Sequence, residues 1–129
     1  TVVSACLNRA RRLAVLAERL DAGILCTAAA ADAAKEYALR YIGKTAQRDG
    51  GFRVYEIFDG DPYSVRQAKE SLREPFSSGL YALYGGKFSE AKRLFMDIVR
   101  RQDQDGAARY YLYLADRCEK DPPEEISLG

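Results

Sequence analysis

The sequence predicts an α+β chain in two parts. The first is a helix–strand–helix–strand–strand segment over residues 1–60, and the second is an all-helical hairpin tail over residues 61–129. Two observations predict this division into two parts. In the first part, short apolar stretches alternate with stripes at helical spacing. At residues 59–62 the sequence Asp-Gly-Asp-Pro supplies four turn-forming residues, and beyond it the apolar pattern is helical throughout.

The composition excludes several classes of protein. The 129 residues include 20 Lys and Arg against 19 Asp and Glu, so bulk charge gives no argument for binding nucleic acid or a membrane surface. No apolar run approaches the roughly 20 residues needed to cross a bilayer. The sequence has no histidine, which excludes Ser-His-Asp triads, Cys-His dyads and His-ligated metals.

The three cysteines and the single methionine bear on the setting of the chain. Cys6, Cys26 and Cys118 lie far apart and form no zinc or redox motif, which fits a reducing, cytoplasmic setting. The only methionine is Met96, and the chain starts at Thr1 with no signal-peptide pattern. We therefore expect the chain to be a piece of a longer protein.

The elements of the first part follow from local signals. Within residues 4–20 the apolar side chains recur at helical spacing and form one stripe, which predicts a helix. We expect Gly23 to cap its C-terminal end. Residues 24–26 are too few for a helix and predict a buried strand. Thr27 is the expected N-cap of a second, alanine-rich helix over residues 28–38.

A hairpin completes the first part. Residues 39–46 and 52–58 predict two strands, and the second alternates apolar and aromatic side chains with polar ones. Between them, the sequence Arg-Asp-Gly-Gly at residues 48–51 is a strong turn signal.

The second part predicts helices only. Asp61 and Pro62 form an N-cap and first-turn pair for a helix over residues 62–72, which Pro75 is expected to break or kink. Three apolar faces follow, separated by turns at Gly85-Gly86 and at residues 103–106. Their members are Phe76, Gly79, Leu80, Leu83 and Tyr84; then Phe88, Ala91, Phe95, Ile98 and Val99; then Ala107, Tyr111, Leu114, Ala115 and Cys118.

This helical pattern resembles one tetratricopeptide repeat with a partial second. The positions that carry the resemblance are Gly79, Gly86, Phe88, Ala91 and Phe95, whereas the usual early Trp and closing Pro are absent. One such repeat needs something to pack against. Residues from 121 onward are expected to be frayed.

Asn8 and Arg12 are the main candidates for chemistry. They stand four residues apart, so they share one face of the first helix. An amide and a guanidinium held together can bind a sugar oxygen and a phosphate, and Arg suits charge spread over phosphate oxygens. The alternative interpretation is that Asn8 and Arg12 belong to a polar helix face that is exposed to water. For Arg9 and Arg11 we expect a solvated face or a contact to a neighbouring domain, and for Lys44 and Arg48 an exposed turn.

The stretch from Thr1 through Asn8, Ala10 and Arg12 to Leu13 resembles the late catalytic segment of class III adenylate/guanylate cyclases. That family reads hydrophobic-Asn-x-Ala-x-Arg-Leu at the start of a helix. The downstream order is similar too, over residues 23–27, 40–43 and 54–58. The resemblance covers residues 1–60, and more loosely residues 61–118, and it implies the C-terminal part of a ferredoxin-like catalytic domain.

The resemblance implies a function for each candidate. Asn8 would orient the ribose, Arg12 would stabilise charge developing on the α-phosphate, and Thr1 would read the purine edge, as is compatible with an adenylate cyclase. The parent protein would convert ATP to cyclic AMP and pyrophosphate as a homodimer, in the cytoplasm or at the cytoplasmic face of a membrane. Two Mg²⁺ or Mn²⁺ ions would be held by aspartates outside this chain. The fragment alone would be inactive.

The sequence also departs from the family pattern. Ala5 stands where an Asp is common, Arg9 and Arg11 replace small or apolar residues, and Asp49-Gly50-Gly51 replaces a Lys-Gly pair. An alternative is therefore a non-catalytic interaction module, in which the helical hairpin binds a partner on a degenerate cyclase scaffold. A third interpretation is that residues 62–118 cover the sheet or help two subunits pair. An exposed apolar stripe on the last helix would favour partner binding, and a buried one would favour packing.

Overall fold

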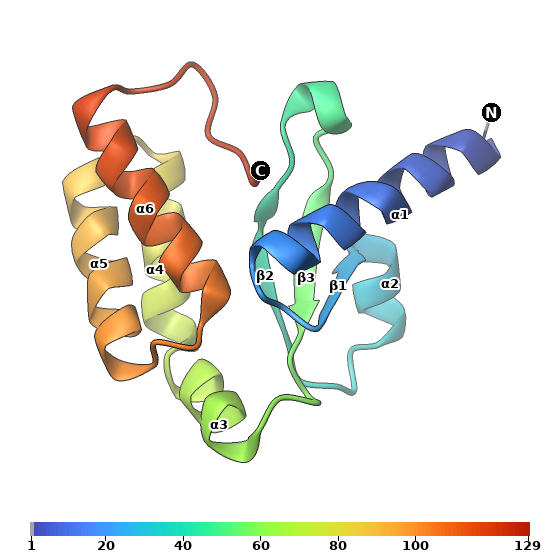
Figure 1. The fold of residues 1–129 in the computed structure, drawn as a ribbon, viewed down its shortest axis with the longest axis horizontal. Coiled ribbons are helices and arrows are strands. Elements are labelled where there is room, and N and C mark those ends of the chain that lie inside the picture. Colours follow the sequence, from blue (N-terminus) through green and yellow to red (C-terminus); the bar gives the residue numbers. More distant parts are fainter. Residues whose placement is uncertain (1) are drawn as a thin grey trace. The chain divides into compact units, whose positions relative to one another are not determined.

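The computed structural model describes residues 2–129, and it describes side chains from Ala5 onward. The chain divides into two compact units (Figure 1). The first runs up to Asp59 and also includes Ser127–Gly129, and the second is Gly60–Ile126. The α+β class is confirmed. Within the described residues, no helix is both long enough and apolar enough to span a membrane.

The first unit is a three-stranded antiparallel sheet with two helices (Figure 1). Its elements in chain order are α1 (Val2–Arg19), β1 (Ile24–Thr27), α2 (Ala28–Ala33), β2 (Leu39–Lys44), the short 3-10 helix η1 (Gln47–Asp49) and β3 (Arg53–Ile57). This is the predicted order of helices and strands. The central strand is β3, which pairs with β1 on one side and β2 on the other. A bulge between Tyr41 and Gly43 shifts the register of the β2–β3 pair.

The end of α1 differs from the prediction. The left-handed residue is Asp21, with φ of 52°, and Gly23 has no positive φ. The Ala22 N–H donates to the Ala17 carbonyl at 2.9 Å, and the Asp21 N–H donates to the Glu18 carbonyl at 3.2 Å. These two bonds form a Schellman motif two residues before Gly23, so the expected glycine cap is wrong.

The second helix is shorter than predicted. Thr27 caps it as expected, since its Oγ1 accepts from the Ala30 N–H at 3.4 Å. However, α2 ends at Ala33 and not at residue 38. The Ala38 N–H donates to Asp59 Oδ1 at 3.1 Å. This bond joins the residue before β2 to the segment that follows β3. The helix itself ends locally, since the Ala34 N–H donates to the Ala30 and Ala31 carbonyls.

The core of the first unit lies under the C-terminal half of α1. Its fully buried side chains are Leu16, Leu20, Ile42, Val54 and Phe58. Residues 24–26 were expected to be buried as a strand, but Ile24 is 52% exposed and only Cys26 is buried. The reason is topological, because β1 is an edge strand of the sheet.

Buried charges also pair within this sheet. Arg40 on β2 and Glu56 on β3 are each 3% exposed, and Arg40 Nη2 lies 2.7 Å from Glu56 Oε1. The two residues are Cα partners in the β2–β3 register, so their side chains share one face of the sheet.

The second unit contains four helices: α3 (Tyr63–Ser71), α4 (Arg73–Tyr84), α5 (Phe88–Arg101) and α6 (Gly106–Lys120). Asp61 does not cap α3, contrary to expectation. Its carboxylate accepts from the Nζ of buried Lys69 at 2.6 Å, and the N-cap is Pro62. The break near Pro75 is confirmed, since α3 and α4 meet at Leu72. Pro75 has no N–H to donate to the carbonyl four residues earlier and would clash with it.

An aromatic cluster holds α4, α5 and α6 together. The ring of Phe95 lies 5.5 Å from that of Phe76 and 5.4 Å from that of Tyr111, centroid to centroid. On α6, Ala107, Tyr111, Ala115 and Cys118 are all buried. The apolar face of the last helix is therefore used in packing.

The last three residues pack on the first unit, so the fraying expected from residue 121 does not extend to them. Leu128 is fully buried, and its N–H donates to the Lys44 carbonyl at 2.7 Å. Thr45 and Leu128 form a parallel bridge next to β2. A buried leucine and a backbone hydrogen bond thus return Ser127–Gly129 to the first unit, although a helical tail was expected through residue 129.

Candidate functional site

Asn8 and Arg12 line the same groove of the first unit. They lie one helical turn apart on α1, and the hairpin between β2 and β3 forms the opposite wall. The groove has a volume of about 590 Å³. Its lining residues are Ala5, Asn8, Arg9, Arg11, Arg12, Val15, Arg48, Asp49 and Gly50.

The groove is strongly basic. Among the described residues, four arginines line it (Arg9, Arg11, Arg12 and Arg48), and Asp49 supplies the one carboxylate. Guanidinium groups present several N–H donors in a plane and bind phosphate and carboxylate oxygens with two hydrogen bonds at once. The groove therefore fits an anion such as a phosphate group.

The same residues do not fit a divalent cation. Mg²⁺ and Mn²⁺ prefer several oxygen ligands, whereas the single carboxylate here already pairs with Arg12. No group of three or more Cys, Asp or Glu side chains that could hold a metal occurs elsewhere in the described residues. The residues that line the groove offer donors to anions and a single carboxylate.

Arg12 is held through one nitrogen of its guanidinium. Its Nη2 donates to the Gly129 carbonyl at 3.2 Å and lies 3.5 Å from Asp49 Oδ2. Its Nε is buried and has no hydrogen-bond partner among the described residues. A buried donor without an acceptor carries a desolvation cost of about 1–3 kcal/mol. Arg12 thus has unused hydrogen-bonding capacity.

The hairpin that carries Arg48 and Asp49 is formed by a short helix and a glycine turn. The 3-10 helix η1 carries both residues, and Gly50 and Gly51 reverse the chain with positive φ values of 106° and 59°. Directly after the turn, the Phe52 N–H donates to Thr45 Oγ1 at 3.1 Å, which joins the two sides of the hairpin. The predicted turn is confirmed, and it includes an unexpected helical turn.

Sequence reasoning found part of this site. It placed Asn8 and Arg12 on one face, and both line the groove. Thr1 lies outside the described residues. It did not anticipate that Arg9, Arg11 and Arg48 would line the same groove, although Arg48 is 81% exposed, as expected for a turn. The signal that could have found Arg9 and Arg11 is their place beside Asn8 and Arg12 on the same helix, whereas Arg48 is brought to the groove by the hairpin.

Arg9 has a second contact that fixes its direction. Its guanidinium carbon lies 5.5 Å from the centre of the Phe52 ring. A cation over an aromatic face is favoured by the ring quadrupole. This contact ties α1 to the start of β3 beside the groove.

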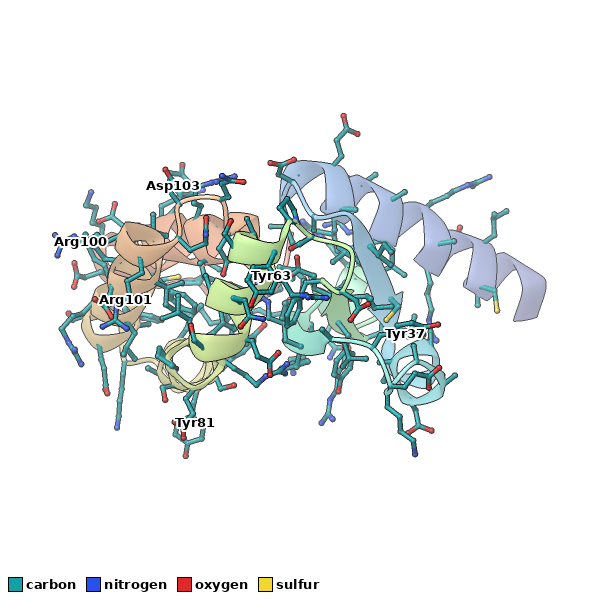
Figure 2. The ribbon with its side chains drawn as sticks, turned by 90° about the horizontal axis from the view of Figure 1, so that it is seen from below. Tyr37, Tyr63, Tyr81, Arg100, Arg101 and Asp103 are labelled. Atoms are coloured by element: carbon teal, nitrogen blue, oxygen red, sulfur yellow. The ribbon has the colours of Figure 1, made fainter. Side chains whose placement is uncertain are left out.

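Two of the cysteines are buried, and the second unit has both exposed and buried tyrosines. Burial raises the pKa of the Cys26 thiol, which keeps it protonated and unreactive, and burial likewise raises the pKa of Cys118. In the second unit, Tyr63 and Tyr81 are 71% and 83% exposed, and Tyr81 points away from the helices (Figure 2). Tyr111, by contrast, belongs to the aromatic cluster.

No protein family, curated protein or solved structure that was compared with the chain matches it.

Proposed function

We propose that this chain is the C-terminal portion of a class III nucleotide cyclase, the parent protein of which converts ATP to cyclic AMP and pyrophosphate. The observation that carries the proposal is that Asn8 and Arg12 lie one turn apart on α1 and line one arginine-rich groove. The order of helices and strands around them supports it, since the same order accompanies these motifs in the family.

Each residue has a distinct role in this proposal. Arg12 stabilises the negative charge that develops on the α-phosphate as the ribose 3′ oxygen attacks. Asn8 orients the ribose through its side-chain amide, which can both donate and accept a hydrogen bond. Thr1 contacts the purine edge. An interaction that strengthens only in the transition state raises kcat more than it improves binding.

The metal ions of the reaction belong to residues outside this chain. In this proposal the Mg²⁺ or Mn²⁺ ions are held by two aspartates upstream of Thr1, as the family resemblance implies, and the groove residues supply the contacts to phosphate. The active form is a homodimer in which each site is completed by the second subunit.

The test uses the full-length parent protein and a cyclic AMP assay. Arg12→Ala should lower kcat by about a hundredfold or more while KM for ATP changes little, as for loss of a transition-state contact. Arg19→Ala is the matched control, because Arg19 lies on the same helix but not in the groove. Equal activity of the wild type and Arg12→Ala would remove the assignment.

A second test needs only the gene. Sequencing upstream of Thr1 over about one domain length should reveal two aspartates on adjacent strands. Their absence would favour the alternative of a degenerate scaffold without catalysis.

A further inference from the structure

The segment Ser127–Gly129 docks directly beside Arg12. Leu128 is fully buried, and its N–H donates to the Lys44 carbonyl at 2.7 Å. The next carbonyl, that of Gly129, accepts from Arg12 Nη2 at 3.2 Å. Gly129, which lies 117 positions from Arg12 in the sequence, therefore contacts the side chain on which the proposed function depends.

Only glycine fits at position 129 in this arrangement. Its φ is +90°, a conformation that other residues rarely adopt. A Cβ there would stand 3.0 Å from Leu16 Cδ2 and closer still to Arg12 Nη2. The backbone of Gly129 thus lies against the guanidinium with no room for a side chain.

The hydrogen bonding of Arg12 is incomplete in this arrangement. A phosphate or carboxylate takes two parallel N–H bonds from a guanidinium, and Nε with Nη2 forms one such pair of donors. The Gly129 carbonyl accepts from Nη2, while Nε remains buried with no acceptor among the described residues. A phosphate could satisfy both donors with two of its oxygens, whereas the Gly129 oxygen accepts from Nη2.

We infer that Ser127–Gly129 is a strap that competes with phosphate groups for Arg12. The inference rests on the proposed function, because it describes the regulation of that same site. When the strap is docked, the Gly129 carbonyl occupies a donor that a phosphate needs. When phosphate binds through Nε and Nη2, the Gly129 carbonyl leaves and the Leu128 N–H loses its bond to Lys44.

The strap is held through buried Leu128 and the bond of its N–H to the Lys44 carbonyl. The segment is short and has one buried side chain, that of Leu128, so local release costs much less than unfolding the unit. The arginines of the groove attract the anion that displaces it.

The experiment uses the whole 129-residue chain and inorganic pyrophosphate as the probe. Calorimetry measures the affinity, and hydrogen exchange measures protection of the Leu128 amide. Gly129→Ala and Leu128→Asp should each release the strap and tighten pyrophosphate binding about tenfold, as expected when a competing hydrogen bond is removed. Glu124→Ala, at an exposed position that precedes the strap, should bind as the wild type does. In the wild type, saturating pyrophosphate should abolish protection of the Leu128 amide.

Several results would overturn the inference. Unchanged affinity in both strap variants, or no binding of pyrophosphate by any of the proteins, would show that the strap and phosphate do not compete. Weaker binding in both would show that the strap positions Arg12 instead. Leu128→Ala provides a third, milder release if either variant fails to fold.

These readouts need no turnover. Release of the strap by pyrophosphate in a protein whose parent makes no cyclic AMP would contradict the proposed function and leave the competition standing. Cyclic AMP formation that depends on Arg12, with a Leu128 amide still protected at saturation, would contradict only the strap.

Discussion

Gly79 of α4 lies directly against the ring of Phe95 of α5: a Cβ on Gly79 would stand only 2.7 Å from Phe95 Cζ. The ring cannot move away easily, because Phe95 is fully buried and its ring stacks on that of Tyr111. The close approach of α4 and α5 therefore depends on the missing side chain.

Gly79→Ala should destabilise the protein. The overpacking cost of about 1–3 kcal/mol exceeds the gain of up to about 1 kcal/mol from replacing a helical glycine by alanine. Urea unfolding measures the difference. Gly60→Ala is the matched control, because a Cβ on Gly60 would meet nothing within 4 Å and its φ is not positive. A Gly79→Ala variant more stable than the wild type would show that the helices can separate at no cost.

The pair formed by Arg40 and Glu56 predicts a strong asymmetry between single and double variants. Glu56→Ala should cost about 3–5 kcal/mol, because it leaves a buried guanidinium without its carboxylate. Arg40→Met combined with Glu56→Leu should recover much of this loss, since no unpaired charge stays buried.

Denaturant unfolding of both variants measures these effects. Arg53→Ala, an exposed change on the same strand as Glu56, provides the control and should have little effect. Additive losses from the two changes at Arg40 and Glu56 would contradict a coupled pair.

The basic groove predicts a salt-sensitive affinity for anions. Pyrophosphate binding to the chain should weaken several-fold as the salt concentration rises from about 50 to about 200 mM, because salt screens the attraction between the anion and the arginines of the groove. Arg48→Ala should reduce both the affinity and its salt dependence, whereas Arg19→Ala should change neither. Titration calorimetry at several salt concentrations measures both, and a salt-independent affinity would exclude binding by these arginines.

A charge network between α5 and α6 predicts how stability changes with pH. Lys92 Nζ lies 2.9 Å from Asp116 Oδ1 and 3.5 Å from Glu119 Oε1. The hydrogen bond from Lys92 lowers the pKa of Asp116, and the hydrogen bond to Asp116 raises the pKa of Lys92. The hydrogen bond from Ser89 lowers the pKa of Glu119.

The direction of each pH effect on the free energy of unfolding follows from the difference in pKa between the folded and unfolded states. Carboxylates with lowered pKa values stabilise the fold above about pH 4, and this contribution is lost as the pH falls further. The raised pKa of Lys92 contributes below about pH 10.4 and is lost as the pH rises further. The stability advantage of the wild type over Asp116→Asn should therefore shrink when unfolding is measured below about pH 4. An advantage that persists at about pH 2, below the usual carboxyl range, would contradict the network.

Local signals were sufficient for much of the fold. The order of helices and strands in the first unit, the Thr27 cap, the Gly50-Gly51 turn and the break before Pro75 all depend on neighbours within a few residues. The pairing of Asn8 with Arg12 on one face follows from helical periodicity alone. That these two residues serve a cyclase stays a prediction.

Other features required the tertiary structure. The contact of Ala38 with Asp59, the pairing of Asp61 with Lys69 and the exposure of Ile24 on an edge strand all depend on the fold. Sequence spacing does not encode these, because each joins elements through a contact that only folding creates.

The sequence by itself determined the elements, their order and the shared face of Asn8 and Arg12, because these depend on propensity and periodicity. Only the tertiary structure decided that the hairpin arginine Arg48 joins that face in a groove and that Gly129 contacts Arg12 across 117 positions. The physical reason is that buried leucines and backbone hydrogen bonds, formed between distant segments, determine which polar side chains meet.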